Sequence, residues 1–251
     1  PLFDTLDGTF PNHEANPLKA ETLVALQKRV RSGAYAFGVA FDGDADRAGF
    51  IDETGAVIPM DMVTALIARS VLASEKGPIF YDLRSSWAVK EEIVAAGGTP
   101  MMSRVGHAFI KQQMRDAKAL FAGELSGHYY FRDNFYTESS AMAVLRLAAI
   151  VTASPKPLSA LVRPIRRYFA SGEINSEVAD PPAALQRLKK AYGRKGNLLE
   201  LDGISVEFAD WWFNVRMSNT EPLVRLNLEA KTEDVMTLRR DELLAMIRAK
   251  S

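Results

Sequence analysis

Up to about residue 152, short apolar runs alternate with longer stretches that have apolar residues at helical spacing. The short runs predict buried strands at 36–41, 48–52, 78–83, 100–105 and 119–124, with a glycine-containing hairpin turn at 53–57. The helical spacing predicts helices at about 20–31, 60–73, 86–96, 107–118 and 139–152. This alternation predicts a parallel or mixed sheet with helices on its faces.

The pattern changes in the stretch 153–164, which carries three prolines and is typical of a domain boundary. We also expect the hinge for any domain motion there. Beyond it, the sequence predicts a strand at 172–179, a helix at 182–192, short strands within 198–230 and a last helix at 232–249. The predicted fold class is therefore α/β, with mixed-sheet α/β/α domains followed by a smaller α+β C-terminal domain.

Composition limits the possible functions. The chain has 251 residues, 47% of them hydrophobic, which is enough for about two globular domains. Lys plus Arg equal Asp plus Glu at 31 each, so no bulk charge attracts nucleic acid or a membrane surface, and any anion must be bound by a local cluster. Cysteine is absent, which excludes thiolate metal sites. We find no apolar run of about 20 residues and no signal peptide, and therefore expect a cytoplasmic protein.

A cluster of acidic residues follows the strand predicted at 36–41. In "FDGDADRAGF", Asp42, Asp44 and Asp46 occupy alternate positions and Arg47 comes next. Carboxylates are the hard oxygen ligands that Mg²⁺ and Ca²⁺ prefer. An EF-hand is excluded because its loop needs glycine where Arg47 stands, and because the flanking segments are strands.

Two alternatives to such a metal site remain open for the acidic cluster. A phosphatase of the haloacid dehalogenase type would use Asp42 as nucleophile and Asp44 as acid/base, but it leaves Asp46 and Arg47 without a role, and no downstream acidic pair suits its metal. A solvated acidic turn is the simpler alternative. Ligands in α/β sheets bind at the carboxyl ends of strands, and the prediction places Asp42, Arg84, His107 and Glu124 there.

A second motif, "GELSGH" at 123–128, has the groups needed to bind a sugar. Glu124 can accept hydrogen bonds from two vicinal hydroxyls and Ser126 can add another, while the glycines allow close approach. His128 is a candidate for proton transfer or sugar contact. The alternative is a structural glycine turn between strands, with a structural histidine.

A third motif, "RMSNTEP" at 216–222, follows the apolar run "WWFNV". Guanidinium, hydroxyl and amide groups at a strand end can surround a phosphate, and an arginine can bind it through two hydrogen bonds. The alternative is a surface turn. We expect one of the two tryptophans to enter the core and the other to cover it. The candidate phosphate ligands are Arg216, Ser218, Asn219, Thr220 and, on the following strand, Arg225.

Together these motifs resemble the metal-binding, sugar-binding and C-terminal phosphate-binding loops of the α-D-phosphohexomutases, in the same order. "DGTFPNHEANP" near the start also resembles the end of that family's second domain. The resemblance implies that 1–56 is the C-terminal part of domain 2, 57–165 is domain 3 and 166–251 is domain 4. The chain begins at Pro1 without Met and lacks the family's Thr-x-Ser-His-Asn type phosphoserine motif, so we expect a fragment whose N-terminal phosphoserine domain is missing.

The resemblance also implies roles for individual residues. Asp42, Asp44 and Asp46 would hold Mg²⁺, and Arg47 would help to hold the phosphate of the phosphoserine. Arg84 stands where many members have lysine, and the family position of His107 makes it a candidate substrate contact. Lys111, one helical turn further, is expected to be a solvated helix residue.

The activity implied is a mutase that interconverts 1-phospho and 6-phospho hexoses, of mannose and/or glucose, through a phosphoserine and a bisphosphorylated intermediate. Without the phosphoserine domain, this chain alone should be inactive. Leu125 stands where phosphoglucosamine mutases usually have Gln, which favours the phosphomannomutase/phosphoglucomutase type. The alternatives are a phosphoglucosamine mutase and a non-catalytic module that binds phosphosugars.

Overall fold

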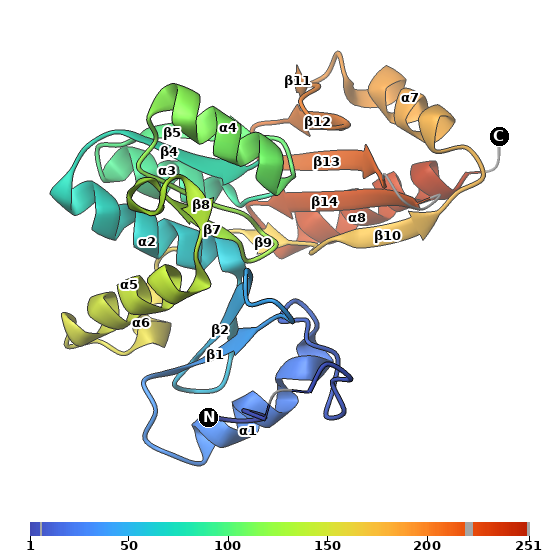
Figure 1. Cartoon of the computed structure of the whole chain (residues 1–251). Coiled ribbons are helices and arrows are strands. Elements are labelled where there is room, and N and C mark those ends of the chain that lie inside the picture. Colours follow the sequence, from blue (N-terminus) through green and yellow to red (C-terminus); the bar gives the residue numbers. More distant parts are fainter. Residues whose placement is uncertain (6, 219–222, 250–251) are drawn as a thin grey trace. The chain divides into compact units, whose positions relative to one another are not determined.

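The structure of the protein is a computed structural model (Figure 1), and it describes residues 1–5, 7–218 and 223–249. The chain forms two compact units, Pro1–Arg166 and Arg167–Ser251. Within the described residues, the first unit contains two sheets and the second contains one, and each unit has its own core. Among the described residues, no helix has the length and apolar character needed to cross a membrane.

The first unit begins with a small antiparallel sheet in the order β1-β2-β3. Its strands are β1 (Phe37–Phe41), β2 (Ala48–Asp52) and β3 (Val57–Ile58), and they follow a 3-10 helix η1 (Ala20–Leu23) and α1 (Val24–Arg31). The predicted strands and hairpin turn are confirmed. The expectation that the strand before Asp42 belongs to the same sheet as the later strands is wrong, because β1 pairs with β2 in a separate sheet.

The second sheet of this unit has the order β5-β4-β6-β7-β8. Its members are β4 (Pro78–Asp82), β5 (Thr99–Ser103), β6 (Phe121–Gly123), β7 (Tyr129–Phe131) and β8 (Thr137–Glu138). β4 pairs in parallel with β5 and β6, and β7 is antiparallel to both of its neighbours, so the predicted mixed sheet is confirmed. The pattern did not predict β7 and β8, which are too short to show a period.

Helices cover both faces of this mixed sheet. They are α2 (Met60–Ser74), α3 (Trp87–Ala95), α4 (His107–Ala117) and α5 (Ser140–Thr152). On one face, Ile110 and Met114 of α4 pack against Phe80 and Ala122. On the other, α2 lies so close to β6 that Thr64 contacts the backbone of Gly123. Because β4, β5 and β6 are parallel, the loops after them all open at one edge.

The proline-rich stretch is not an open linker throughout. It contains α6 (Leu158–Val162), whose Ser159 backbone N–H donates to Glu53 Oε2 at 3.1 Å. The Ser159 hydroxyl also donates to the other oxygen of Glu53. This part of the predicted boundary therefore belongs to the first unit, which ends at Arg166.

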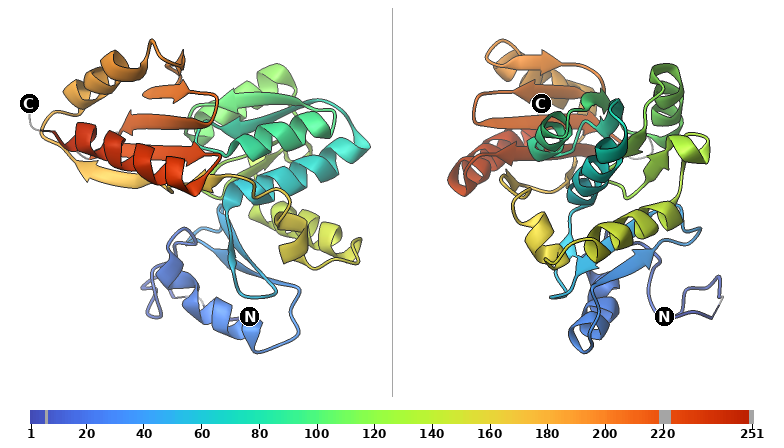
Figure 2. Two further views of the ribbon diagram at one scale, coloured as in Figure 1. Left: turned by 180° about the vertical axis from the view of Figure 1, so that it is seen from behind. Right: turned by 90° about the vertical axis from the view of Figure 1, so that its left-hand side faces the viewer.

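The second unit is an antiparallel sheet in the order β10-β14-β13-β12-β11, with β9 also paired to β14. Leu188 and Leu243, from the two helices of this unit, join one core with Phe213, so both helices cover the same face of the sheet. Figure 2 shows α8 against that face. The elements are β9 (Phe169–Ala170), β10 (Ile174–Glu177), α7 (Pro181–Tyr192), β11 (Asn197–Leu199), β12 (Ile204–Glu207), β13 (Trp211–Met217), β14 (Leu223–Ala230) and α8 (Glu233–Arg248).

The two tryptophans take opposite faces of this sheet, as alternate positions of a strand must. Trp211 joins the core beneath the helices. Trp212 donates its indole N–H to Glu229 Oε1 at 3.1 Å. The expectation that one ring enters the core is confirmed, and the other is also buried, at 7% exposure.

We expect Gly123→Ala to destabilise the first unit. A Cβ atom there would lie 2.1 Å from Thr64 Oγ1, so α2 and β6 would have to move apart. Overpacking of this kind costs about 1–3 kcal/mol. Urea unfolding measures the loss, and Gly8→Ala, where no atom lies within 4 Å of the added Cβ, is the control. Equal stability of the two variants would contradict the close packing.

Candidate functional site

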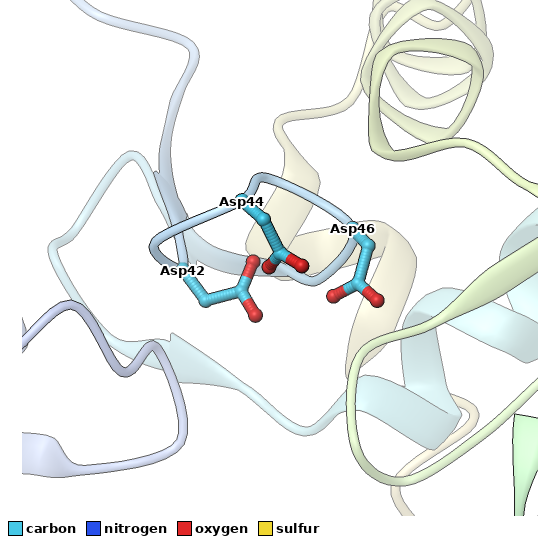
Figure 3. Close-up of side chains that lie close together, drawn as sticks. All are labelled: Asp42, Asp44 and Asp46. Atoms are coloured by element: carbon cyan, nitrogen blue, oxygen red, sulfur yellow. The ribbon is translucent and has the colours of Figure 1, made fainter.

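The loop 42–47, drawn in Figure 3, is held in a fixed shape by hydrogen bonds between Asp42 and Arg47. The β1–β2 ladder closes with Phe41 opposite Ala48, so the loop is a tight one. Asp42 Oδ1 accepts the backbone N–H of Arg47 at 3.0 Å, and Asp42 Oδ2 accepts from Arg47 Nε at 2.5 Å. Ala45 has a φ of 58°, a left-handed conformation that costs a non-glycine residue roughly 1–2 kcal/mol.

Three carboxylates converge in this loop, as Figure 3 shows. Asp42, Asp44 and Asp46 each offer one oxygen, and these atoms all lie within 4.8 Å of one another. Burial raises the pKa of Asp46, and the charges of Asp42 and Asp44 raise it further, while His128 opposes the shift. Burial would also raise the pKa of Asp42, but hydrogen bonds from Arg47 lower it overall. Such a donor set fits a hard divalent cation, which would relieve the repulsion.

The sugar-loop candidate Glu124 is buried and held on both oxygens. Its side chain is 2% exposed. Oε1 accepts the backbone N–H of Gly106 at 3.1 Å, and Oε2 accepts the hydroxyl of Tyr130 at 2.5 Å. Burial, and then the charge of Glu124, raise the pKa of Tyr130, so this hydroxyl remains a donor. Tyr130 was not among the residues predicted from the sequence, since an aromatic residue in a short strand is typical of a core.

The turn 124–128 also contacts the acidic loop. Ala48, just after that loop, donates its N–H to the carbonyl of Gly127 at 3.0 Å. His128 Nε2 lies 3.2 Å from Asp46 Oδ2, and His128 Nδ1 lies 2.8 Å from Ser126 Oγ. His128 therefore lies between a candidate metal ligand and a candidate sugar ligand.

Asp82, which was also not predicted from the sequence, joins the turn after β4 to the sugar loop, residues 123–128. Its side chain is fully buried, and Oδ2 accepts both Arg84 Nη2 and the backbone N–H of Leu125, each at 2.7 Å. Oδ1 accepts the backbone N–H of Arg84 at 2.8 Å. Asp61 accepts the N–H of Ser86 at 3.0 Å in the same turn, and burial raises the pKa of Asp61. The sequence did offer a signal for Asp82, because it is an acidic residue at the end of a buried apolar strand.

His107 and Lys111 are on α4, beside the same strand ends. The side chain of His107 is 59% exposed, and its ring centroid lies 6.3 Å from that of His128. Lys111 is not solvated as expected: its side chain is 22% exposed and donates to Glu138 Oε1 at 3.0 Å. The cause is β8, the unpredicted short strand that brings Glu138 to this helix.

In the second unit, Arg216 of β13 lies opposite Arg225 of β14. Arg216 Nη2 donates to Glu173 Oε2 at 2.8 Å, and Arg225 Nη2 lies 3.5 Å from Ser218 Oγ. The candidates Asn219 and Thr220 lie outside the described residues. The structure thus brings the sugar and acidic loops together within the first unit, and Arg216, Ser218 and Arg225 together within the second.

The mixed sheet, with polar turns at the carboxyl ends of its parallel strands, places the first unit in the class of α/β folds whose ligands bind at those strand ends. Models of the phosphoglucomutase/phosphomannomutase family match the chain in three parts. Alpha/beta/alpha domain II matches residues 1–55, alpha/beta/alpha domain III residues 59–168 and the C-terminal domain residues 173–246. The chain belongs to this family.

Individual relatives agree. The chain is 42% identical over 250 residues to a phosphomannomutase of Salmonella typhimurium, covering 98% of this chain and 55% of the relative. It is 42% identical over 245 residues to a phosphomannomutase of Methanocaldococcus jannaschii, covering 97% of this chain and 54% of the relative. The chain spans about half the length of the curated relatives it matches.

A solved structure shows the same fold. The crystal structure of a phosphoglucomutase/phosphomannomutase family protein from Burkholderia thailandensis superposes with a TM-score of 0.88 at 30% identity, covering 98% of this chain and 54% of that one. A phosphomannomutase structure from Thermus thermophilus has a TM-score of 0.71 at 19% identity, covering 92% of this chain and 51% of that one. At this identity it supports the fold alone.

We expect Asp82→Asn to weaken the fold around the sugar loop. It removes the charge that pairs with Arg84 in a fully buried position, and breaking a buried pair costs about 3–5 kcal/mol. Urea unfolding measures the loss. Asp133→Asn, which removes an acid that is 64% exposed in a surface pair, is the matched control and should change stability by less than about 1 kcal/mol. A similar small change in Asp82→Asn would show that Asp82 does not hold the turn.

Proposed function

We propose that this chain supplies the metal, sugar and phosphate sites of a hexose-phosphate mutase that interconverts 1-phospho and 6-phospho sugars of mannose and/or glucose. The observation that carries the proposal is His128, which contacts Asp46 of the acidic loop and Ser126 of the sugar loop. A sugar bound at the sugar loop would therefore lie beside a cation bound at the acidic loop. The names of the relatives, phosphomannomutase and phosphohexose mutases, favour this reaction.

Asp42, Asp44 and Asp46 are the proposed ligands of Mg²⁺. Three convergent carboxylates with two of them partly or fully buried fit a small hard cation. When bound, such a cation would neutralise charge on a phosphoryl group during its transfer. Arg47 would add a positive charge beside the same group, because Asp42 fixes its Nε and a guanidinium has further N–H donors.

Glu124 and Ser126 are the proposed sugar ligands. Gly106 and Tyr130 hold the Glu124 carboxylate in one orientation, leaving lone pairs that can accept hydrogen bonds from vicinal hydroxyls. The resemblance implies contacts to the O3 and O4 hydroxyls, which would suit mannose and glucose alike because these sugars differ at C2. His128 is proposed to move a proton or contact the sugar, with Arg84 and His107 as further substrate contacts.

The non-reacting phosphate is proposed to bind at Arg216, Ser218, Asn219, Thr220 and Arg225. In this proposal residues 1–56 complete domain 2, 57–165 form domain 3 and 166–251 form domain 4. The 251 residues contain no Thr-x-Ser-His-Asn motif, so the phosphoserine must come from outside them. We expect these residues alone to bind substrate without catalysing the reaction through a phosphoserine.

Replacing one carboxylate tests the proposed metal site. Asp44→Asn removes a charge from the most exposed member of the cluster, so the fold should be preserved. We expect Mg²⁺ affinity to fall at least about tenfold, or about 1.4 kcal/mol. Titration calorimetry with MgCl₂ measures it, and Asp4→Asn, an exposed acid outside the loop, is the control. An unchanged affinity would mean that the cluster is a solvated acidic turn.

Sugar-phosphate binding tests the function itself. With Mg²⁺ present, glucose 1-phosphate and mannose 1-phosphate should bind with similar affinity, and both Glu124→Ala and Arg216→Ala should weaken binding at least about tenfold. Calorimetry measures the affinities, and circular dichroism checks that the variants fold. Glu21→Ala removes an exposed acid in η1 and should change nothing. If neither sugar phosphate binds to the folded chain, the proposed site is wrong or lacks groups that supply most of the affinity.

A further inference from the structure

The second unit places two like charges side by side. Arg216 and Arg225 are directly opposite in the β13–β14 ladder, so their side chains emerge on the same face of the sheet. Like charges in such positions repel and destabilise a sheet. This arrangement therefore needs a counter-charge whenever no anionic ligand is bound.

Glu173 supplies that charge. Glu173 Oε2 accepts from Arg216 Nη2 at 2.8 Å, and Glu173 Oε1 lies 3.4 Å from Arg225 Nη1. Asn227 Nδ2 also donates to Oε2, at 3.3 Å. One carboxylate thus contacts both guanidinium groups and is itself only 26% exposed.

An irregularity in the sheet precedes Glu173. Ala170 of β9 pairs with Glu229, whereas Ile174 of β10 pairs with Leu226. Four steps along one strand therefore match three along the other, which is a β-bulge. Gly172, in the bulge, has a φ of 68°, a left-handed conformation that glycine adopts without strain.

The bulge decides which face Glu173 occupies. Continuing the β10 register places Glu173 opposite Asn227, on the face that carries Arg225. Without the extra residue, Glu173 would lie opposite Leu226, which belongs to the apolar core. A one-residue change of register moves a side chain to the other face of a sheet, so the bulge is what brings the carboxylate to the arginines.

The arginines retain donors beyond those that Glu173 uses. Arg216 Nε and Arg225 Nε are buried and have no hydrogen-bond partner among residues 1–5, 7–218 and 223–249. A guanidinium has five N–H donors in a planar fork, so it can hold one carboxylate and still bind a second anion. The pair can thus accept a phosphate beside Glu173.

We propose that Glu173 is a built-in counter-ion that holds Arg216 and Arg225 together in the absence of phosphate and limits how tightly they bind it. The inference deepens the proposed function and rests on the proposed phosphate role of these arginines. Because the carboxylate stays on the same guanidiniums, it repels an arriving phosphate dianion. A restrained affinity suits a site that must release one phosphate of the sugar and accept the other within each reaction.

Glu173→Gln tests the inference, because it removes the charge and keeps the shape. We expect inorganic phosphate to bind about tenfold more tightly to Glu173→Gln than to the natural chain, in calorimetry at constant ionic strength. We also expect the variant to melt at a lower temperature without phosphate, and to be stabilised more by added phosphate. Glu177→Gln, which removes an exposed acid from β10, the strand that begins directly after Glu173, is the matched control and should resemble the natural chain.

The outcomes separate this inference from the proposed function. If Arg216→Ala abolishes phosphate binding by the natural chain, but Glu173→Gln binds phosphate no more tightly, the counter-ion role is wrong and the phosphate site stands. If the natural chain shows no phosphate binding or stabilisation that depends on Arg216, both ideas fail. Loss of stability in Glu173→Gln that phosphate does not restore would show a purely structural role and would also overturn the inference.

Discussion

Compensation of charge at close range is the constraint on which this structure depends. A buried charged group is costly unless an opposite charge or hydrogen bonds accompany it. Asp42 is accompanied by Arg47, and Asp82 by Arg84, each from within a few residues along the chain. Glu124 instead has a backbone N–H and a tyrosine hydroxyl. In each case the group that compensates the charge also fixes the loop, so the electrostatics and the geometry of the site have one origin.

The ends of the parallel strands bring these charge-compensated groups together at one place. Parallel strands β4 and β6 deliver Asp82 and the sugar loop to one edge, and Asp82 then bonds the N–H of Leu125 across that edge. The acidic loop comes from a different sheet and meets the sugar loop through Ala48 and His128. Three turns are thereby held together by partly buried hydrogen bonds. Such preorganisation would suit the proposed phosphoryl transfer.

The sequence predicted local features better than contacts between distant residues. Helical spacing, short apolar runs and the motif loops were recognisable because each depends on neighbours in the chain. The sheet to which β1 belongs could not be recognised from the sequence, because strand pairing is set by long-range packing. Tyr130 and Asp82 were missed because their importance comes from partners that tertiary structure supplies. Lys111 was misjudged for the same reason, since Glu138 reaches it only through the short strand β8.

The hydrogen bonds of Ser159 to Glu53 have a consequence for recombination between homologous genes. The family's domain II and domain III models meet between residues 55 and 59, yet this contact joins the two sides of that junction within one compact unit. Every residue of β2, just before the junction, is buried. A chimaera with its crossover at this junction would combine residues from two parent proteins in the core of the first unit. A crossover near Arg166 would instead take the core of each unit from one parent protein.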